Sequence, residues 1–364
     1  MKINEVIGCL ENIAPPSLQE SYDNCGLLTG SDSWECSGII VSLDATEAVV
    51  EEAIAKGCNL IVAHHPIIFS GLKKITGKNY VERTVIAAIK NDIAIYAIHT
   101  NLDNVLHGVN GRIADKLGLK NRRILSAKKE TLKKLFTYVP VEHLDKVRDA
   151  VFAAGGGMIG NYSECSFAGE GTGSFKANEG MDPFVGDVGQ RHYEKEAKLE
   201  IVFEAWKEKQ ILNALIRNHP YEEVAYDIIS LDNVYQQTGS GLIGELEAET
   251  DEIFFLDNIK KAFGLKIIRH TALSGKKIKK VAICGGAGSF LINAAIAAGA
   301  DLYVTSDIKY HDFFEADNRV VLADIGHYES EQFTIDLLAE FLENKFPTFA
   351  VLKTGVKTNP VEYY

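Results

Sequence analysis

The sequence predicts an α/β protein in which two similar half-domains form one core, with a separate α+β domain of the ferredoxin-like type inserted between them. The first half is expected over residues 1–130, the insert over 131–233 and the second half over 234–364. Three observations predict this arrangement. Short apolar runs alternate with helical patterns in the first third, the same order returns in the last third, and the middle third follows a different order.

The first third begins with an amphipathic helical pattern over residues 3–13 and continues with an apolar run over 38–44 that predicts a strand. Residues 45–56 have a helical pattern, and Gly57 is a typical C-terminal stop for such a helix. A second run, residues 60–63, is short, β-branched and uncharged, as expected for a strand that is covered on both faces in a parallel sheet. The predicted order is therefore β-α-β.

Two adjacent histidines, His64 and His65, follow this second strand directly. They lie at its carboxyl end, which in open α/β sheets is the edge where ligands bind. Pro66 ends the strand and restricts His65 to extended geometry. Because neighbouring side chains of an extended chain point to opposite sides, the two imidazoles suit two neighbouring metal ions, or one ion and a substrate. The alternative is two partly buried histidines with backbone partners.

A third strand is predicted over residues 93–98, after a helical pattern over roughly 80–91. It ends in the segment HTNLD, residues 99–103, which is a second group of ligand-type side chains at the carboxyl end of a strand. If this segment is helical, His99 and Asp103 share one face because they are four residues apart.

The middle of the chain, about residues 132–233, has the order strand, helix, Gly-rich hairpin, strand, helix, strand. This β-α-β-β-α-β order predicts a ferredoxin-like domain with two helices on one face of an antiparallel sheet. A basic stretch, residues 120–134, precedes it and is expected to be a solvated linker rather than a nucleic-acid patch.

The last third repeats the plan of the first. Residues 53–65 (AIAKGCNLIVAHH) align without a gap with residues 295–307 (AIAAGADLYVTSD), so that in both a helix, a glycine stop and a strand precede polar residues. A further predicted strand, residues 320–325, is followed by His327 and, four residues later, Glu331. A repeat of this kind predicts two half-domains whose equivalent strand ends face one cleft.

Composition excludes several classes of function. The net charge of −12 argues against general binding to nucleic acid, which depends on Lys and Arg at phosphates. No run approaches the ~18 apolar residues of a membrane span and the N-terminal residues do not resemble a signal peptide, so a cytoplasmic protein without a membrane partner is expected. The 6 cysteines contain no CxxC pair, so neither a thiolate zinc site nor a disulfide scaffold is indicated.

The side chains at the predicted strand ends form a ligand set for divalent transition metals: His64, His65, Asp103, His327 and Glu331. Imidazole with carboxylate suits Zn, Mn, Fe, Co or Ni, whereas Mg and Ca prefer oxygen ligands throughout. Five ligands exceed the roughly three or four that one catalytic ion takes from a protein. Two ions per chain with one bridging carboxylate fit better, which predicts a dinuclear metal cleft in the core.

Five motifs indicate a resemblance to a known family. They are AHHPIIFSG at 63–71, IHTNLDNVLHGVN at 98–110 and IGHYESEQFT at 325–334, with GGAGS at 285–289 and TSDIKYHDF at 305–313 in support. On these motifs the chain resembles the Nif-three-like proteins known as GTP cyclohydrolase 1 type 2 homologs. The resemblance covers residues 1 to about 130 and 235–364, and no ligand position departs from the family pattern.

The resemblance implies that the five residues bind two metal ions and that Glu331 bridges them. It also implies a ring-shaped homohexamer in which the metal sites face an internal cavity. The longer members of the family carry a middle domain that looks like the trimeric PII or CutA proteins, which the predicted β-α-β-β-α-β order of the insert matches.

His99 and His311 are the candidate acid–base residues around the ions. His99 is placed to hold a ligand or a metal-bound water by a hydrogen bond, although a structural histidine is an equal alternative. The loop 285–289 follows a strand and opens a helix, so its amides are candidates for holding a phosphate, or it is simply a tight strand-to-helix turn.

The predicted function is that of a dinuclear metal-dependent hydrolase acting on a nucleotide or a similar phosphorylated small molecule. The family name implies GTP cyclohydrolase activity, but no residue pattern in the sequence accounts for recognition of guanine. The alternative is a metal-binding regulatory or scaffold protein without turnover, in which the insert senses a metabolite or a partner.

Overall fold

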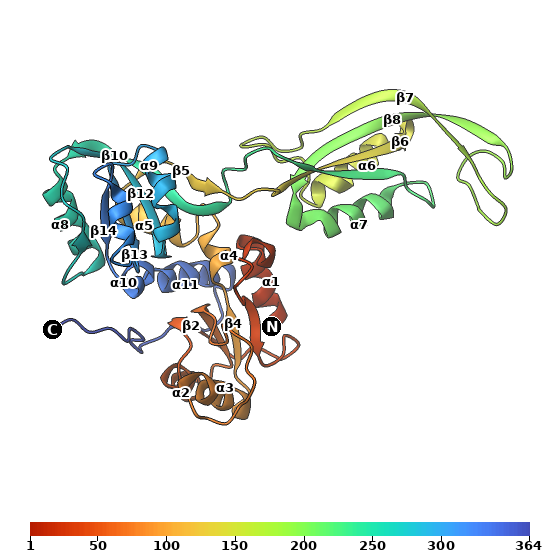
Figure 1. Ribbon diagram of the computed structural model, residues 1–364. Coiled ribbons are helices and arrows are strands. Elements are labelled where there is room, and N and C mark those ends of the chain that lie inside the picture. The colour runs from red at the N-terminus through yellow and green to blue at the C-terminus, as the bar shows by residue number, and fades with distance from the viewer. The chain divides into compact units, whose positions relative to one another are not determined.

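The computed structural model describes residues 1–364, and the chain divides into two compact units (Figure 1). The first unit, called the core below, consists of Met1–Ala127 and Gln236–Tyr364. The second unit, called the insert, is Lys128–Tyr235. The fold is mixed α/β with three sheets. None of the helices has both the length and the apolar character that a membrane span would need.

The first sheet of the core has five strands. In spatial order they are β1 (Gly26–Thr29), β4 (Ala94–Ala97), β3 (Leu60–His65), β2 (Ile39–Asp44) and β15 (Val351–Lys353). The last four are parallel to one another and β1 is antiparallel to β4. The three inner strands are buried along almost their whole length, as their apolar, β-branched sequences predict.

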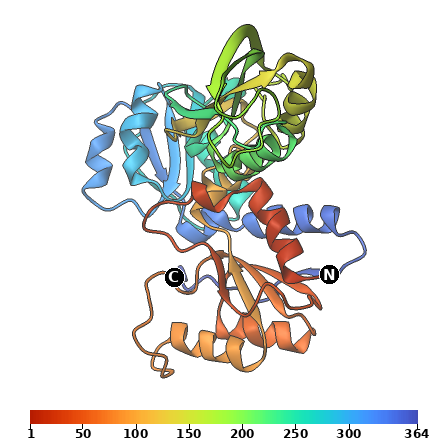
Figure 2. The same cartoon turned by 90° about the vertical axis from the view of Figure 1, so that its right-hand side faces the viewer.

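Helices cover both faces of this sheet (Figure 2). Helices α2 (Glu47–Ala55) and α3 (Tyr80–Lys90) pack on one face through an apolar cluster. Helices α1 (Ile3–Ile13) and α11 (Thr334–Lys345) pack on the other. Because both faces are covered, the side chains that reach solvent or ligands from these strands are those at the strand ends.

The second sheet of the core has six strands. In spatial order they are β11 (Arg269–His270), β14 (Val321–Asp324), β13 (Leu302–Ser306), β12 (Ile278–Ala287), β10 (Gly239–Thr250) and β5 (Lys120–Ala127). The strands β12, β13 and β14 are parallel, and the others are antiparallel to their neighbours. The aligned segments of the sequence repeat end in β3 and β13, and each of these strands lies between two parallel neighbours.

The remaining helices of the core are α4 (Thr100–Asp103), α5 (Val109–Lys116), α8 (Glu252–Phe263), α9 (Ile292–Ala297) and α10 (His327–Glu331). Two of them begin just beyond a parallel strand. The helix α4 follows β4, and α10 follows β14. Each of these two helices therefore presents its side chains at the carboxyl end of a parallel strand.

The two halves exchange strands, which differs from the sequence-based expectation. Residues 120–134 were expected to form a solvated linker, but β5 occupies most of this stretch, where Ile124 is buried and faces Leu242 of β10. The strand β5 thus belongs to the second sheet, although it precedes the insert in the chain. In return, β15 near the C-terminus completes the first sheet. One apolar cluster contains residues of both halves.

The insert has the element order β-α-β-β-α-β. Its elements are β6 (Leu132–Pro140), α6 (Leu144–Ala153), β7 (Phe167–Lys176), β8 (Arg191–Glu204), α7 (Glu208–Asn218) and β9 (Tyr226–Leu231). The strands are antiparallel in the order β7-β8-β6-β9. Both helices pack on one face through an apolar cluster that includes Leu135, Val151, Leu199 and Leu215. The opposite face of the sheet has no helix of its own.

Candidate metal centre

Three short segments of the core bring the predicted ligands together. His64 and His65 end β3, Asp103 ends α4, and α10 begins with His327 and ends with Glu331. Their ligand atoms form two groups, each within 4.8 Å: His65, His327 and Glu331, and His64, Asp103 and Glu331. A third such group contains His64, His65 and His99. The cluster therefore contains all five predicted ligands and one of the two predicted acid–base residues.

Glu331 belongs to both carboxylate-containing groups. Its Oε2 lies 3.0 Å from Nε2 of His65 and 3.1 Å from Nε2 of His327, while its Oε1 lies 4.0 Å from Nε2 of His64. The residue is 2% exposed. Its carboxylate thus directs one oxygen toward each group, which is the arrangement that a bridging ligand requires.

Each histidine of the cluster uses its Nδ1 to donate a hydrogen bond away from the centre. The acceptors are Ile98 O for His64 (2.8 Å), Asp44 Oδ1 for His65 (2.7 Å), Asp23 Oδ1 for His99 (2.8 Å) and Asp307 Oδ2 for His327 (2.7 Å). This pattern fixes the tautomer, leaves Nε2 as the ligand atom, and is typical of metal-binding histidines.

The three aspartates of this pattern were not identified from the sequence. Asp44 ends β2 and is directly paired with His65 of β3, so the register of two neighbouring strands places them together. Asp307 follows β13 and is the residue that aligns with His65 in the sequence repeat. Its place in the repeat was a signal that could have found it. Asp23 lies in a turn far from His99 in sequence, and no pattern pointed to it.

Two buried atoms of the cluster have no hydrogen-bond partner. Nε2 of His64 and Oδ1 of Asp103 are both shielded from solvent, and they lie 3.6 Å apart. A buried polar atom without a partner costs free energy, so such atoms are rare unless a ligand completes the site. An imidazole nitrogen and a carboxylate oxygen that face each other in this way are a fitting pair of donors for a divalent cation.

The pKa values of the cluster show how strongly its groups interact. Burial lowers the pKa of His64 to about 3, which keeps this imidazole neutral and able to bind a metal. Burial also lowers the pKa of His65 and of His327, but hydrogen bonds to Asp44, Asp307 and Glu331 outweigh it and raise the two values to about 9 and about 11. Without an ion, protons on these imidazoles balance the carboxylates.

His99 lies beside the cluster, with its ring centroid 5.2 Å from that of His64 and 5.3 Å from that of His65. Its partner Asp23 accepts further hydrogen bonds from the thiol of Cys25 and from the backbone and hydroxyl of Thr100. Burial raises the pKa of Asp23, but these hydrogen bonds and that from His99 outweigh it and hold the pKa well below its usual value. A carboxylate of this kind orients the imidazole firmly.

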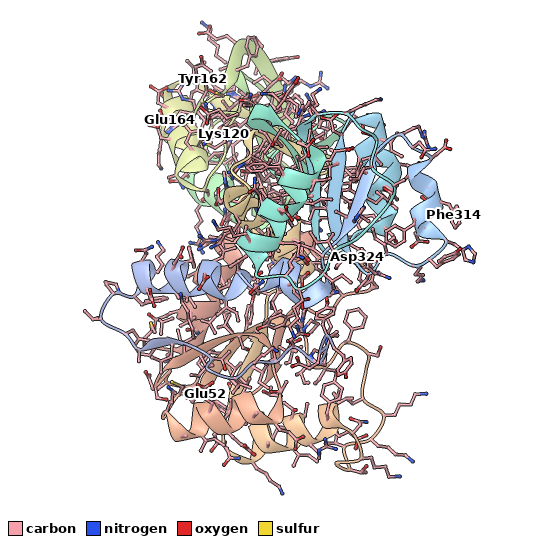
Figure 3. The ribbon with its side chains drawn as sticks, turned by 90° about the vertical axis from the view of Figure 1, so that its left-hand side faces the viewer. Glu52, Lys120, Tyr162, Glu164, Phe314 and Asp324 are labelled. Atoms are coloured by element: carbon pink, nitrogen blue, oxygen red, sulfur yellow. The ribbon has the colours of Figure 1, made fainter.

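His311, the second predicted acid–base residue, does not join the cluster. It precedes the 3-10 helix η5 (Asp312–Ala316), and its ring contacts the rings of Tyr310 and Phe314. Figure 3 shows Phe314, which is part of this helix, at the outer edge of the second half. The chain turns at Asp307, so Asp307 itself occupies the strand end and His311 is carried away from it.

Two amides of the glycine loop 285–289, the candidate phosphate site, are already hydrogen-bonded within the protein. The amide of Gly285 donates to Asn110 Oδ1 and the amide of Gly286 to Ser330 Oγ, so neither is available for a phosphate. A Cβ at Gly286 would overlap Oε1 of Glu331 and lie 3.4 Å from Cε1 of His327. The loop therefore makes room for the central carboxylate.

A cavity of about 460 Å³ opens beside the cluster. Its wall includes His65 and His327 together with Asp44 and Asp307, the aspartates that orient them. The lining also contains Tyr328 and, from the C-terminal segment, residues 359–361 and Tyr363. The segment is held by hydrogen bonds such as that from Nδ2 of Asn359 to Glu329. A small molecule in this cavity would contact the metal-ligand side chains directly.

Comparisons with known proteins agree on one family. The model of the family Duf34/NIF3 (NGG1p interacting factor 3) matches residues 1–360. The chain is 38% identical over 363 residues to a GTP cyclohydrolase 1 type 2 homolog of Halalkalibacterium halodurans, with 98% of each chain covered. It is 39% identical over 326 residues to the homolog of Bacillus subtilis, covering 89% of this chain and 87% of the relative.

Solved structures give the same result. The crystal structure of a Bacillus cereus protein related to NIF3 superposes with a TM-score of 0.88 at 36% sequence identity, covering 100% of this chain and 99% of the other. A Staphylococcus aureus protein superposes with a TM-score of 0.79 at 32% identity, over 100% of this chain and 99% of the other. The similarity extends over both the core and the insert.

Proposed function

Because the chain belongs to the Duf34/NIF3 family, we propose that its core binds two divalent transition-metal ions, drawn from Zn, Mn, Fe, Co or Ni, at the strand-end cluster. The unpartnered, buried Nε2 of His64 and Oδ1 of Asp103 carry this proposal, because a cation is the ligand that satisfies both. One ion would be held by His64 and Asp103 and the other by His65 and His327, with Glu331 shared. Four histidines that all donate from Nδ1 to a fixed acceptor support it further.

We further propose that the protein is a hydrolase for a nucleotide or a similar phosphorylated small molecule. The bound ions would lower the pKa of a water molecule and neutralise charge on the substrate oxygens. The cavity beside the cluster supports this proposal, because its wall includes two of the proposed ligands and its volume of about 460 Å³ suits a small substrate. The names of the relatives, GTP cyclohydrolase 1 type 2 homologs, are consistent with a nucleotide.

His99 is the proposed acid–base residue of this reaction. Its Nδ1 is committed to Asp23, so its Nε2 is the atom that accepts or donates a proton. Asp23 acts as a positioning residue because it holds the tautomer of His99. The close approach of the His99 ring to those of His64 and His65 places this Nε2 near the proposed ions. His311 has no part in the proposed reaction.

The proposed assembly is the homohexamer, with an insert of the PII or CutA type. The open strand edges of the insert support self-association, because such edges tend to be paired between copies. Threefold contacts between inserts combined with twofold contacts between cores would close a ring of six chains.

The activity is tested with protein loaded with Mn or Zn and screened against nucleotides and phosphoesters. Turnover of at least one class is expected, and His99→Ala should lower it by about 10²-fold or more while the metal content stays the same. His311→Ala is the matched control, since it removes an imidazole outside the cluster and should leave turnover unchanged. Full metal loading without any turnover would contradict the hydrolase and favour the regulatory alternative.

A further inference from the structure

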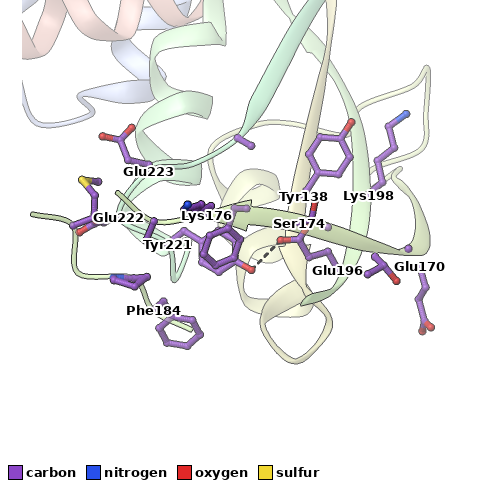
Figure 4. Close-up of a pocket in the computed structure, with 18 of the residues that line it drawn as sticks. Tyr138, Glu170, Ser174, Lys176, Phe184, Glu196, Lys198, Tyr221, Glu222 and Glu223 are labelled. Carbon is purple, nitrogen blue, oxygen red and sulfur yellow. Dashed lines mark hydrogen bonds between the residues drawn. The ribbon is translucent and has the colours of Figure 1, made fainter. Parts of the chain in front are cut away.

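A cavity larger than the one at the metal centre lies within the insert. Its volume is about 860 Å³, and it is formed by the uncovered face of the sheet together with residues of the segment that joins β7 to β8 (Figure 4). It lies entirely within the insert, so it is independent of the metal-ligand cluster. No part of the proposed hydrolase uses it.

The sequence of β7 creates the space for this cavity. Gly169, Gly171 and Gly173 alternate along the strand and all line the cavity, so no side chain covers the sheet there. Gly171 pairs with Glu196 of β8, and a Cβ at Gly173 would overlap Oε2 of Glu196. The glycines therefore leave the carboxylate of Glu196 uncovered by β7.

Glu196 is the distinctive group of the cavity. The residue is only 8% exposed, and its Oε1 accepts a hydrogen bond of 2.9 Å from the hydroxyl of Tyr221, as Figure 4 shows. Its Oε2 has no hydrogen-bond partner, and no Lys, Arg or His forms an ion pair with it. Lys198, which also lines the cavity, is engaged by Glu200 and lies over the ring of Phe136. A largely buried carboxylate that keeps one oxygen free is a strong partner for a cation that enters the cavity.

The rest of the lining fits a cation that carries an apolar body. The lining residues include Glu196, Glu222 and Glu223 with Lys198, and also Glu170 and Lys176, whose side chains alternate with the glycines of β7 and point to the other face of the strand. The ring of Tyr221 lies 5.9 Å from that of Phe175 and 6.2 Å from that of Phe184, centroid to centroid. Aromatic faces next to a carboxylate attract organic cations by both cation–π and direct electrostatic interaction.

We infer that this cavity is a binding site for a small organic cation. The ammonium or guanidinium group of the ligand pairs with Oε2 of Glu196, and its apolar or aromatic body packs on Phe175, Phe184 and Tyr221. Such a ligand would give the insert a sensing role. A single bound amine would supply the counter-charge that the carboxylate of Glu196 lacks and would also pack against the aromatic rings.

The inference is tested by isothermal titration calorimetry on the full chain with phenethylamine and agmatine as probes. Phenylacetate and 2-phenylethanol are the anionic and neutral controls of matched shape. Phenethylamine should bind, and both controls should bind at least about tenfold more weakly, because they cannot pair with a carboxylate. Equal binding of the amine and the alcohol, or no binding of either amine, would overturn the inference.

Variants then locate the site. Glu196→Gln should weaken phenethylamine binding by about tenfold or more, whereas Glu200→Gln, on the same strand but already paired with Lys134 and Lys198, should leave it within about twofold. Phe184→Leu serves as a second test, since Phe184 is half exposed and its loss spares the fold. It should weaken binding about threefold.

A second copy of the chain is the competing occupant of the cavity. Light scattering on Glu196→Gln distinguishes the two cases, because a small ligand predicts an unchanged molecular mass. The inference would be overturned if the molecular mass of this variant fell and neither amine bound to the unmodified protein. That result would show that a cationic side chain of another copy fills the cavity.

Discussion

Replacing Gly286 with alanine tests whether the glycine loop exists to accommodate the central carboxylate. Gly286 has φ +64°, so an alanine there costs about 1 kcal/mol of folding free energy from backbone strain alone. In addition, the new Cβ would overlap Oε1 of Glu331, which must move by about 1 Å to regain ordinary contact. A shift of that size in a shared ligand should reduce the affinity for both metal ions by roughly 10- to 100-fold.

The matched control is Gly264→Ala. Gly264 has φ +66° at the end of α8, but a Cβ there has no atom within 4 Å. This variant should lose the same ~1 kcal/mol of stability without any change in metal affinity. The two losses are measured by denaturant unfolding of the metal-free proteins and by competition of each protein with a coloured chelator for zinc. Equal zinc affinity in the two variants would refute the role assigned to Gly286.

Three further predictions follow from the same geometry. Glu331→Ala should lose most of both ions, whereas Asp103→Ala should weaken the binding of mainly one ion, as measured by elemental analysis after gel filtration. Retention of both ions by Glu331→Ala would exclude the bridging role of Glu331. Zinc loading of the metal-free protein at pH 7 should release at least about two protons per chain, measured with a pH indicator in weak buffer. The pKa values of His65 and His327 are raised to about 9 and about 11, so both are protonated below those values, and zinc affinity should rise as the pH increases from 6 toward 9. Affinity that is independent of pH over this range would contradict the assignment of these imidazoles as ligands. Replacement of Lys128–Tyr235 by a short flexible linker should leave a folded core that still binds metal, because Ala127 and Gly239 are already paired on neighbouring strands. Light scattering should show the full-length protein as a hexamer and the deletion variant as a smaller species. A full-length mass of one or two chains would refute the ring.

The sequence was most informative where strand periodicity and residue type coincide. Buried runs that end in His64, His65 and His99 could be placed at a sheet edge because an apolar, β-branched run leaves few alternatives to a covered strand. The spacing of His327 and Glu331 likewise predicted a shared helical face, and the structure places them on α10.

Other features depend on contacts between distant segments, which periodicity does not describe. Asp23 meets His99 across 76 residues, and nothing in its turn-rich sequence surroundings distinguishes it from the other aspartates of the chain. His311 had the right residue type but lies beyond a turn whose direction the sequence does not specify. The strand β5 was missed because its basic residues alternate with few apolar ones, and only its pairing with β10 makes it part of a sheet.

The central claim is tested most directly by anomalous diffraction from crystals of the zinc-loaded protein, recorded above and below the zinc absorption edge. Two anomalous peaks per chain are expected, ~3.5–4 Å apart, with the carboxylate of Glu331 between them. One peak should lie near Nε2 of His64 and Oδ1 of Asp103, and the other near Nε2 of His65 and Nε2 of His327. A single peak, or zinc bound only outside this cluster, would contradict the account.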